Sequence, residues 1–142
     1  MIYTDMTKKA LKLCFEAHKE QTDKSGIPYV FHPFHLAEQM KTEETTITAL
    51  LHDIVEDTDY TLEDLEKMGF SKPIIEALAL LTHDDDTPYM DYVLAAKQNP
   101  IAKAVKLADL KHNSDITRLD VVTEKALERK EKYLKAIALL EE

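Results

Sequence analysis

Glycine is scarce in this chain, and its scarcity limits the folds that the 142 residues can adopt. Only Gly26 and Gly69 interrupt the sequence, and residues that favour helices dominate elsewhere. No segment alternates apolar and polar side chains over the length of a useful strand. The sequence therefore predicts an all-α fold.

Capping residues and apolar periodicity divide the chain into about eight expected helices. A stripe of apolar residues at positions 10, 13, 14 and 17 marks the first of them. Thr61 and Asp64 have the spacing of a capping box. Thr87-Pro88 and Asn99-Pro100 each place a capping residue before a proline. The expected ranges are 5–21, 32–40, 43–57, 61–69, 71–81, a helix from about 88, 101–113 and 123–140.

The bulk properties favour a single domain in a reducing compartment. We expect one domain over residues 1–142, with a core of about 5–120 and a C-terminal helix of about 123–141. Cys14 is the only cysteine, so we expect a buried thiol, no disulfides and a cytoplasmic location. The net charge of −9 argues against a nucleic-acid or anionic-membrane partner. No apolar run is long enough to cross a bilayer.

The segment ALLHDIVEDT gathers four polar groups on one side of the expected helix 43–57. At about 100° per residue, His52 lies above Glu56 and Asp53 lies above Asp57, within a sector roughly 140° wide. Apolar side chains fill the rest of the circumference and can face a core: Leu50, Leu51, Ile54 and Val55. Three carboxylates and an imidazole on such a helix repel and are costly to desolvate unless a cation lies among them. The segment therefore predicts a divalent metal.

Two residues elsewhere can complete a metal site with His52 and Asp53. His32 precedes a proline at a helix start, and Asp109 lies among apolar residues where a buried carboxylate needs a partner. Imidazole and carboxylate ligands without thiolate favour Mn²⁺ or Fe²⁺, with Zn²⁺ and Mg²⁺ as alternatives. Four protein ligands on an octahedral ion leave room for water and a substrate oxygen. We therefore predict His32, His52, Asp53 and Asp109 as metal ligands.

Glu56 is a candidate proton acceptor, and Asp57 lies beside it. A carboxylate one turn from His52 can accept a proton from a metal-activated water. Asp57 could instead hold Glu56 in place or bind a second water molecule. The alternative is a helix end rich in solvated acids, although the helix dipole disfavours acids at a C-terminus.

The remaining histidines do not lie in a comparable motif, so we expect them at the surface or in local hydrogen bonds: His18, His35, His83 and His112. His83 lies beside three aspartates, and this cluster is expected to be a solvated loop.

Four segments of the first 120 residues carry a resemblance to a known family: AHKEQ (17–21), KSGIPYVFHP (24–33), ALLHDIVEDT (49–58) and KLADLKHN (106–113). Together they resemble the HD-domain metal-dependent phosphohydrolases, and among these the hydrolase domain of RelA/SpoT-type proteins and the small alarmone hydrolases. The resemblance implies a single HD-domain helical bundle. It also implies removal of the 3′-pyrophosphate from guanosine tetra- and pentaphosphate.

The resemblance assigns a role to each matching residue. It makes His32, His52, Asp53 and Asp109 ligands of Mn²⁺, and it makes Glu56 and Asp57 the pair that activates water. Lys24, Ser25 and Asn113 match residues beside the nucleotide. The implied partner is a small nucleotide, and the oligomeric state is left open.

The chain departs from the family pattern in two places. Gln21-Thr22-Asp23 replaces a basic run, and the segment 83–92, HDDDTPYMDY, has no lysine or arginine where the family often has several. These departures leave open a less anionic phosphoester as the substrate. A non-catalytic module that binds a nucleotide or metal is a second interpretation, which the retained acids Glu56 and Asp57 disfavour. A structural helical protein with an incidental polar stripe is a third.

Overall fold

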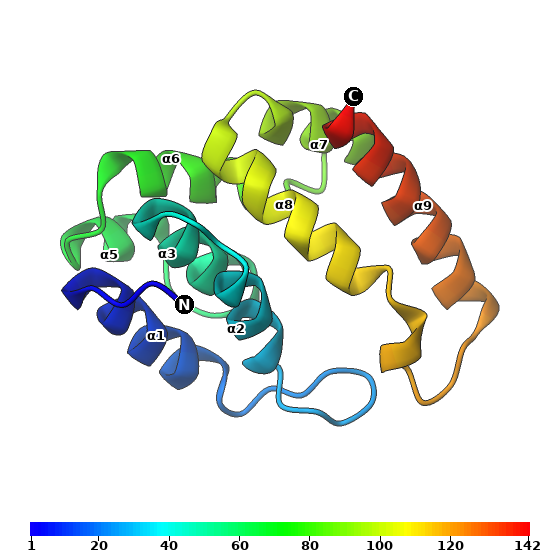
Figure 1. The fold of residues 1–142 in the computed structure, drawn as a ribbon, viewed down its shortest axis with the longest axis horizontal. Helices are drawn as coiled ribbons and strands as arrows, with labels where there is room; N and C mark the ends of the chain where they lie inside the picture. Colours follow the sequence, from blue (N-terminus) through cyan, green and yellow to red (C-terminus); the bar gives the residue numbers. More distant parts are fainter.

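The computed structural model describes all 142 residues, and every regular element in it is helical. The only β contact is an isolated bridge between Thr22 and Pro28. The all-α prediction is therefore confirmed, with nine α-helices and one 3-10 turn (Figure 1). In chain order they are α1 (Asp5–His18), α2 (Phe31–Glu38), α3 (Glu43–Leu51), α4 (Ile54–Asp57), α5 (Leu62–Lys67), α6 (Lys72–Leu81), α7 (Tyr89–Lys97), α8 (Pro100–Asn113), η1 (Ile116–Arg118) and α9 (Glu124–Glu141).

Side-chain caps explain where several helices begin. Thr61 accepts from the Asp64 amide while the Asp64 side chain accepts from the Thr61 amide, which is the predicted capping box. Asn99 likewise caps α8 ahead of Pro100, as predicted. The prediction for Thr87 was wrong, because α7 begins one residue later, after Pro88, and has no side-chain cap. Without a donated hydrogen bond, proline alone sets the start of that helix.

The continuous helix expected over 43–57 is interrupted at Asp53. This residue has φ −102° and ψ 0°, between the helical values of α3 and the short turn α4. The first helix is also shorter than expected and ends at His18. The break means that His52 and Glu56 do not share one regular helical face, so their juxtaposition comes from the turn between α3 and α4.

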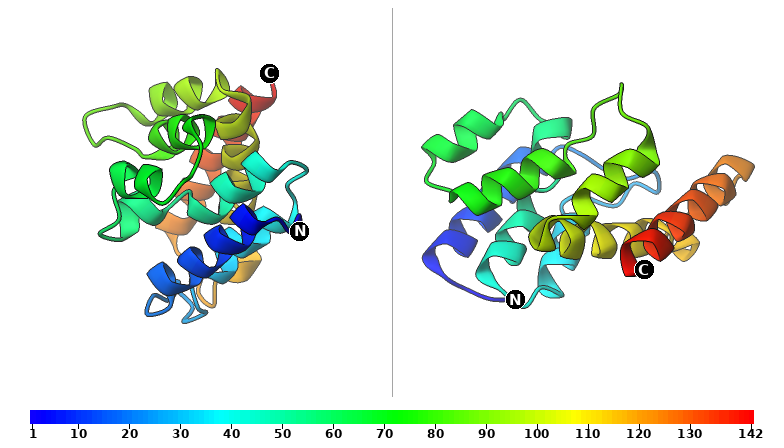
Figure 2. Two further views of the ribbon diagram at one scale, coloured as in Figure 1. Left: turned by 90° about the vertical axis from the view of Figure 1, so that its left-hand side faces the viewer. Right: turned by 90° about the horizontal axis from the view of Figure 1, so that it is seen from above.

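The buried apolar side chains form two clusters on either side of α8. The larger has 20 buried residues, drawn mainly from α1, α2, α3, α6 and α8 with Ile54 of α4, Leu65 of α5 and Ala96 of α7, and it includes Cys14, as expected. The smaller has five, from α7, α8 and α9: Tyr92, Val93, Leu110, Ala136 and Leu140. Burying a leucine side chain such as that of Leu140 contributes about 1.5–3 kcal/mol. Figures 1 and 2 show α8 lying between α1–α6 and the α7–α9 side.

None of the helices combines the length and the apolar character needed to cross a membrane.

Candidate metal centre

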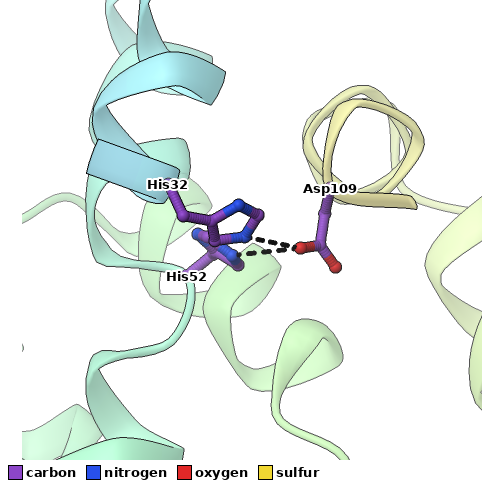
Figure 3. Close-up of side chains that lie close together, drawn as sticks. All are labelled: His32, His52 and Asp109. Carbon is purple, nitrogen blue, oxygen red and sulfur yellow. Dashed lines mark hydrogen bonds and ion pairs between the residues drawn. The ribbon is translucent and has the colours of Figure 1, made fainter. Parts of the chain in front are cut away.

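Three buried side chains from separate helices converge beside α8. His32 lies in the first turn of α2, His52 follows the last residue of α3, and Asp109 lies on α8. A ligand atom from each lies within 4.8 Å of the others, and the three residues are only 4–6 % exposed (Figure 3). Such a set of nitrogen and oxygen donors is suited to a divalent metal ion.

Asp53, the fourth predicted ligand, lies at the edge of this cluster. Its Oδ2 atom is 3.0 Å from Nε2 of His52 and 4.0 Å from Nε2 of His32. The structure thus brings the four predicted ligands together.

His52 is held in the form that a metal ion requires. Its Nδ1 atom lies 2.7 Å from the carbonyl oxygen of Ala49, so Nδ1 carries the proton and donates. Nε2 then has a lone pair, and this buried atom has no hydrogen-bond partner. An unsatisfied buried polar atom costs about 1–3 kcal/mol. A cation between Nε2 and the carboxylates would remove that cost.

The second imidazole, His32, is oriented by His112. The two Nδ1 atoms are 2.7 Å apart, so one donates to the other. Burial and the nearby Arg118 lower the pKa of His112 to about 4, so His112 is neutral and can accept the proton of His32 Nδ1. Nε2 of His32 is then free to face Asp109 Oδ1, 2.9 Å away. The expectation of a surface or locally bonded His112 was wrong.

The electrostatics of the cluster favour positive charge. Burial disfavours the charged imidazole of His52, but Asp53 and Asp109 outweigh it and raise its pKa well above the ordinary value. A site that attracts a proton in this way attracts a metal ion for the same reason.

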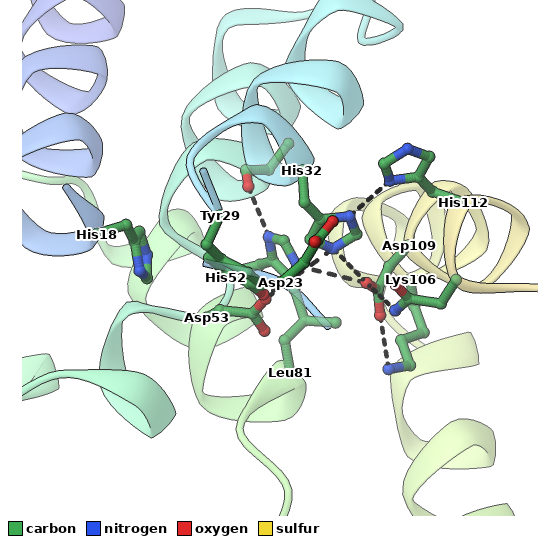
Figure 4. A network of polar contacts seen from close by, with 12 residues as sticks. His18, Asp23, Tyr29, His32, His52, Asp53, Leu81, Lys106, Asp109 and His112 are labelled. Carbon is green, nitrogen blue, oxygen red and sulfur yellow. Dashed lines mark hydrogen bonds and ion pairs between the residues drawn. The ribbon is translucent and has the colours of Figure 1, made fainter. Parts of the chain in front are cut away.

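Lys106, which the sequence reasoning did not assign to the site, neutralises the far side of Asp109. Its Nζ donates to Asp109 Oδ2 at 2.9 Å, and Asn113 donates to Oδ1 at 2.9 Å (Figure 4). Burial alone would raise the pKa of Asp109, but Lys106, followed by His32 and His52, holds it well below the usual range. The signal in the sequence was a lysine three residues before a buried aspartate on one helix.

The predicted acidic pair lies on α4, and its two members face different surroundings. Glu56 lines a cavity of about 140 Å³ together with His52, Asp53 and Asp109, and it accepts a hydrogen bond from the backbone N–H of His83. Burial raises the pKa of Glu56, which strengthens it as a base. Asp57 does not line this cavity. Burial and then Asp53 raise the pKa of its carboxyl.

The three predicted substrate residues are only partly brought together. Lys24 and Asn113 line a second cavity of about 340 Å³, and Asn113 also lines the smaller one. The Ser25 hydroxyl instead donates to the Arg118 carbonyl at 3.2 Å and accepts from the Asp120 amide at 3.0 Å. Ser25 therefore ties its loop to the segment after α8.

The larger cavity contains cations that the sequence reasoning missed. Arg118 and Arg129 are the only arginines in the chain, and both line it. Arg118 is held by the carbonyl oxygen of His112 at 3.0 Å and lies 3.9 Å from Asp23. Tyr133, one turn after Arg129 on α9, lines both cavities. No motif pointed to α9, because the family resemblance ends before it.

The lysine-free segment 83–92 supplies an aromatic wall to the smaller cavity. Tyr89 and Tyr92 line it, and Nζ of Lys106 lies 5.0 Å from the ring centre of Tyr92. The positive charge near the metal cluster therefore comes from α8 rather than from this segment.

The sequence relatives of this chain include proteins named for (p)ppGpp hydrolysis. No protein-family model matches the chain. The chain is 33 % identical over 121 residues to the bifunctional (p)ppGpp synthase/hydrolase SpoT of Escherichia coli (strain K12), covering 75 % of the chain and 17 % of SpoT. It is 36 % identical over 115 residues to the mouse guanosine-3′,5′-bis(diphosphate) 3′-pyrophosphohydrolase MESH1, covering 70 % of the chain and 63 % of MESH1. The chain thus spans less than a fifth of SpoT and under two thirds of MESH1.

The fold also matches a solved structure. A metazoan orthologue of SpoT that hydrolyses ppGpp superposes with a TM-score of 0.77 over 99 % of this chain and 87 % of that one, at 24 % identity. This match confirms the predicted helical bundle.

Proposed function

Because this chain belongs to the HD-domain family that includes the RelA/SpoT-type hydrolase domains, we propose that it is a metal-dependent phosphohydrolase acting on a nucleotide. The first substrate we propose is guanosine 3′,5′-bis(diphosphate), from which it would remove the 3′-pyrophosphate. This proposal rests on one observation: the buried histidine–aspartate cluster adjoins a cavity lined by both arginines of the chain. We further propose that residues 1–142 act as one HD domain in the cytoplasm, with a core of about 5–120 and a C-terminal helix of about 123–141.

The proposed metal ligands are His32, His52, Asp53 and Asp109, and Mn²⁺ is the ion we propose first. Mixed imidazole and carboxylate ligands also suit Fe²⁺, Zn²⁺ and Mg²⁺, which are the alternatives. A divalent ion bound there would lower the pKa of a water molecule and withdraw charge from a phosphoryl oxygen. The lone pair of His52 Nε2, which meets no donor in the protein, supports this assignment.

Glu56 is the proposed proton acceptor. It lines the small cavity beside the ligands, and partial burial raises its pKa, so its carboxylate takes up a proton more readily than that of a fully solvated glutamate. Asp57, the proposed second member of the pair, keeps negative charge on the same turn. Lys106 keeps Asp109 ionised by donating to Oδ2, while the other oxygen, Oδ1, faces His32.

The proposed substrate is anionic and is held by local charge. The net charge of −9 opposes an anion, so attraction must come from cations at the cavity. Lys24, Arg118 and Arg129 provide them, and a planar guanidinium suits a phosphate group. Asn113 lies where the two cavities meet and is the proposed contact between the scissile group and the nucleoside.

A screen of nucleotides with the purified protein tests this proposal. With Mn²⁺ present we expect pyrophosphate release from guanosine 3′,5′-bis(diphosphate), and elemental analysis should find bound metal. Release of phosphate only from less charged nucleotides would move the proposal to a less anionic phosphoester, which the lysine-free segment 83–92 favours. Thermal stabilisation by nucleotides without any turnover would contradict an enzyme and support a binding module.

A further inference from the structure

The turn α4, which carries Glu56 and Asp57, is too short to hold itself in place. It has four residues and follows the break at Asp53. Its own backbone supplies few bonds, among them Asp57 N–H to Asp53 at 3.0 Å and Thr58 N–H to Ile54 at 3.1 Å. Isolated helices of fewer than about 12 residues are marginal in water. Contacts from outside the turn must therefore fix the two carboxylates. Ile54 is buried in the larger apolar cluster and Glu56 accepts from the His83 N–H, and two further contacts hold the ends of the turn.

One outside contact holds the start of the turn. The hydroxyl of Tyr29 donates a hydrogen bond to Oδ2 of Asp53, which precedes α4 (Figure 4). The ring of Tyr29 lies between His18 and His32, with ring centres 5.2 and 5.7 Å away.

A second contact holds the end of the turn. The side-chain amide of Gln21 donates from Nε2 to the carbonyl oxygen of Asp57 at 3.0 Å. The other end of the same amide, Oε1, lies 2.8 Å from Nδ1 of His18, which donates to it. His18 is 1 % exposed and bonds locally, which is one of the two surroundings expected for it, so a buried ring anchors one end of the half-buried Gln21 side chain.

The two contacts come from one rigid piece of chain. The Tyr29 N–H donates to the Gln21 carbonyl at 2.9 Å, and the Gln21 N–H donates to the His18 carbonyl at 2.9 Å. Between them, Thr22 and Pro28 form the only β-bridge. Gln21 and Tyr29 are thus tied directly to each other while they hold opposite ends of α4.

We propose that Gln21 is a positioning residue, which clamps the end of α4 while Tyr29 clamps its start, and so aims Glu56 and Asp57 at the reacting water. The loop between the two clamping residues supplies Thr22, Asp23 and Lys24 to the larger cavity. The effect of Gln21 on catalysis rests on the proposed function. Its effect on the ordering of α4 does not.

Two variants of Gln21 test the clamp. Gln21→Met removes both polar contacts at nearly constant size, and Gln21→Glu keeps an acceptor for His18 but loses the donor to Asp57. Gln39→Met is the matched control, because Gln39 also donates from Nε2 to a backbone carbonyl, that of His35 at 3.1 Å, but at the exposed end of α2. If Gln21→Met fails to fold, the comparison proceeds with Gln21→Glu.

Amide hydrogen exchange is the first measurement. We expect the amides of Asp57 and Thr58 to exchange at least about tenfold faster in both Gln21 variants and at the wild-type rate in Gln39→Met. Steady-state kinetics is the second. Because a small displacement of a catalytic group can cost up to about a hundredfold in rate, we expect kcat to fall between tenfold and a hundredfold, with KM and metal content unchanged.

Unchanged exchange in both Gln21 variants would overturn the clamp. Faster exchange with unchanged kcat would overturn the positioning role. A wild-type protein that hydrolyses no nucleotide would instead refute the proposed function, and the exchange comparison would still decide whether Gln21 holds α4.

Discussion

The metal cluster and the arginine-lined cavity adjoin each other, yet they are built on different physical terms. In the cluster, His32, His52 and Asp109 are almost fully buried. His32 lies 2.9 Å from Asp109, and His52 lies 2.7 Å from the carbonyl oxygen of Ala49. In the cavity, Lys24 is exposed and Arg129 is half-buried, with no ion pair to either. Each buried charged group needs a nearby partner of opposite charge or a hydrogen bond, whereas a charged side chain in water is stable without one. We therefore expect a single substitution in the cluster to abolish turnover, and a single substitution in the cavity to weaken substrate binding only in part.

The largest effect is expected from Asp109→Asn. The substitution keeps the shape of the side chain but removes the charge that faces His32 and His52. Loss of a group that acts as a unit with others typically costs about a thousandfold or more in kcat. Kinetics and elemental analysis should show loss of both turnover and bound metal, with the helical circular dichroism signal retained. Asp91→Asn, on the exposed side of α7, is the matched control. Turnover that survived Asp109→Asn would refute the metal assignment.

A smaller effect is expected from Lys106→Met. The variant leaves Oδ2 of Asp109 without its 2.9 Å partner, so the carboxylate is less well ionised and less well oriented. Loss of such an outer partner typically lowers metal affinity about 10–100-fold, which a metal-buffer titration would measure. Lys106→Arg should recover part of the loss. Lys103→Met removes the same charge one turn earlier on α8, and an equal loss of affinity there would show that only net charge matters.

Arg129→Ala should act on the cavity alone. We expect KM to rise about tenfold, equivalent to about 1.4 kcal/mol, with kcat changed less than about twofold. The rise should shrink at high salt because exposed charges are screened. Lys130→Ala, whose side chain does not line the cavity, is the control. A fall in kcat as large as that of Asp109→Asn would contradict the separation of the two regions.

The smallest effect is expected at Cys14, inside the larger apolar cluster. Burial, and to a lesser extent Asp53, raises the pKa of its thiol to about 12, and the side chain is fully buried. Alkylation at pH 8 should therefore be at least about a hundredfold slower in the folded protein than in urea, as mass spectrometry would show, with activity unaffected. Rapid labelling of the native protein would mean that the interior around α1 opens readily.

The sequence predicted the buried half of the site because burial leaves few solutions. The carboxylate of Asp109 lies in an apolar helix, and the imidazole of His52 lies beside acids. Burying these groups is costly unless a positive charge lies among them, which indicates a cation. The all-α fold followed from scarce glycine and from caps such as Thr61 and Asn99, whose bonds are local in the chain.

The parts that the sequence did not predict depend on contacts between distant segments. The helix breaks at Asp53, beside the contacts with Tyr29 and Gln21. The segment ALLHDIVEDT itself contains no glycine or proline that would predict the break. Arg118 and Arg129 lie in segments without a motif, and their role depends on how η1 and α9 pack beside α8. His112 looked unaccompanied because its partner, His32, lies 80 residues away in the chain.

One helix, α8, sets the spacing between the proposed metal ligand Asp109 and the proposed substrate contact Asn113. Asp109 and Asn113 are one turn apart on it, so about 6 Å of helix rise separates the two residues. Inserting or deleting a single residue between them would swing Asn113 by about 100° around the axis. We therefore expect the number of residues in this turn to matter as much as the identity of its side chains.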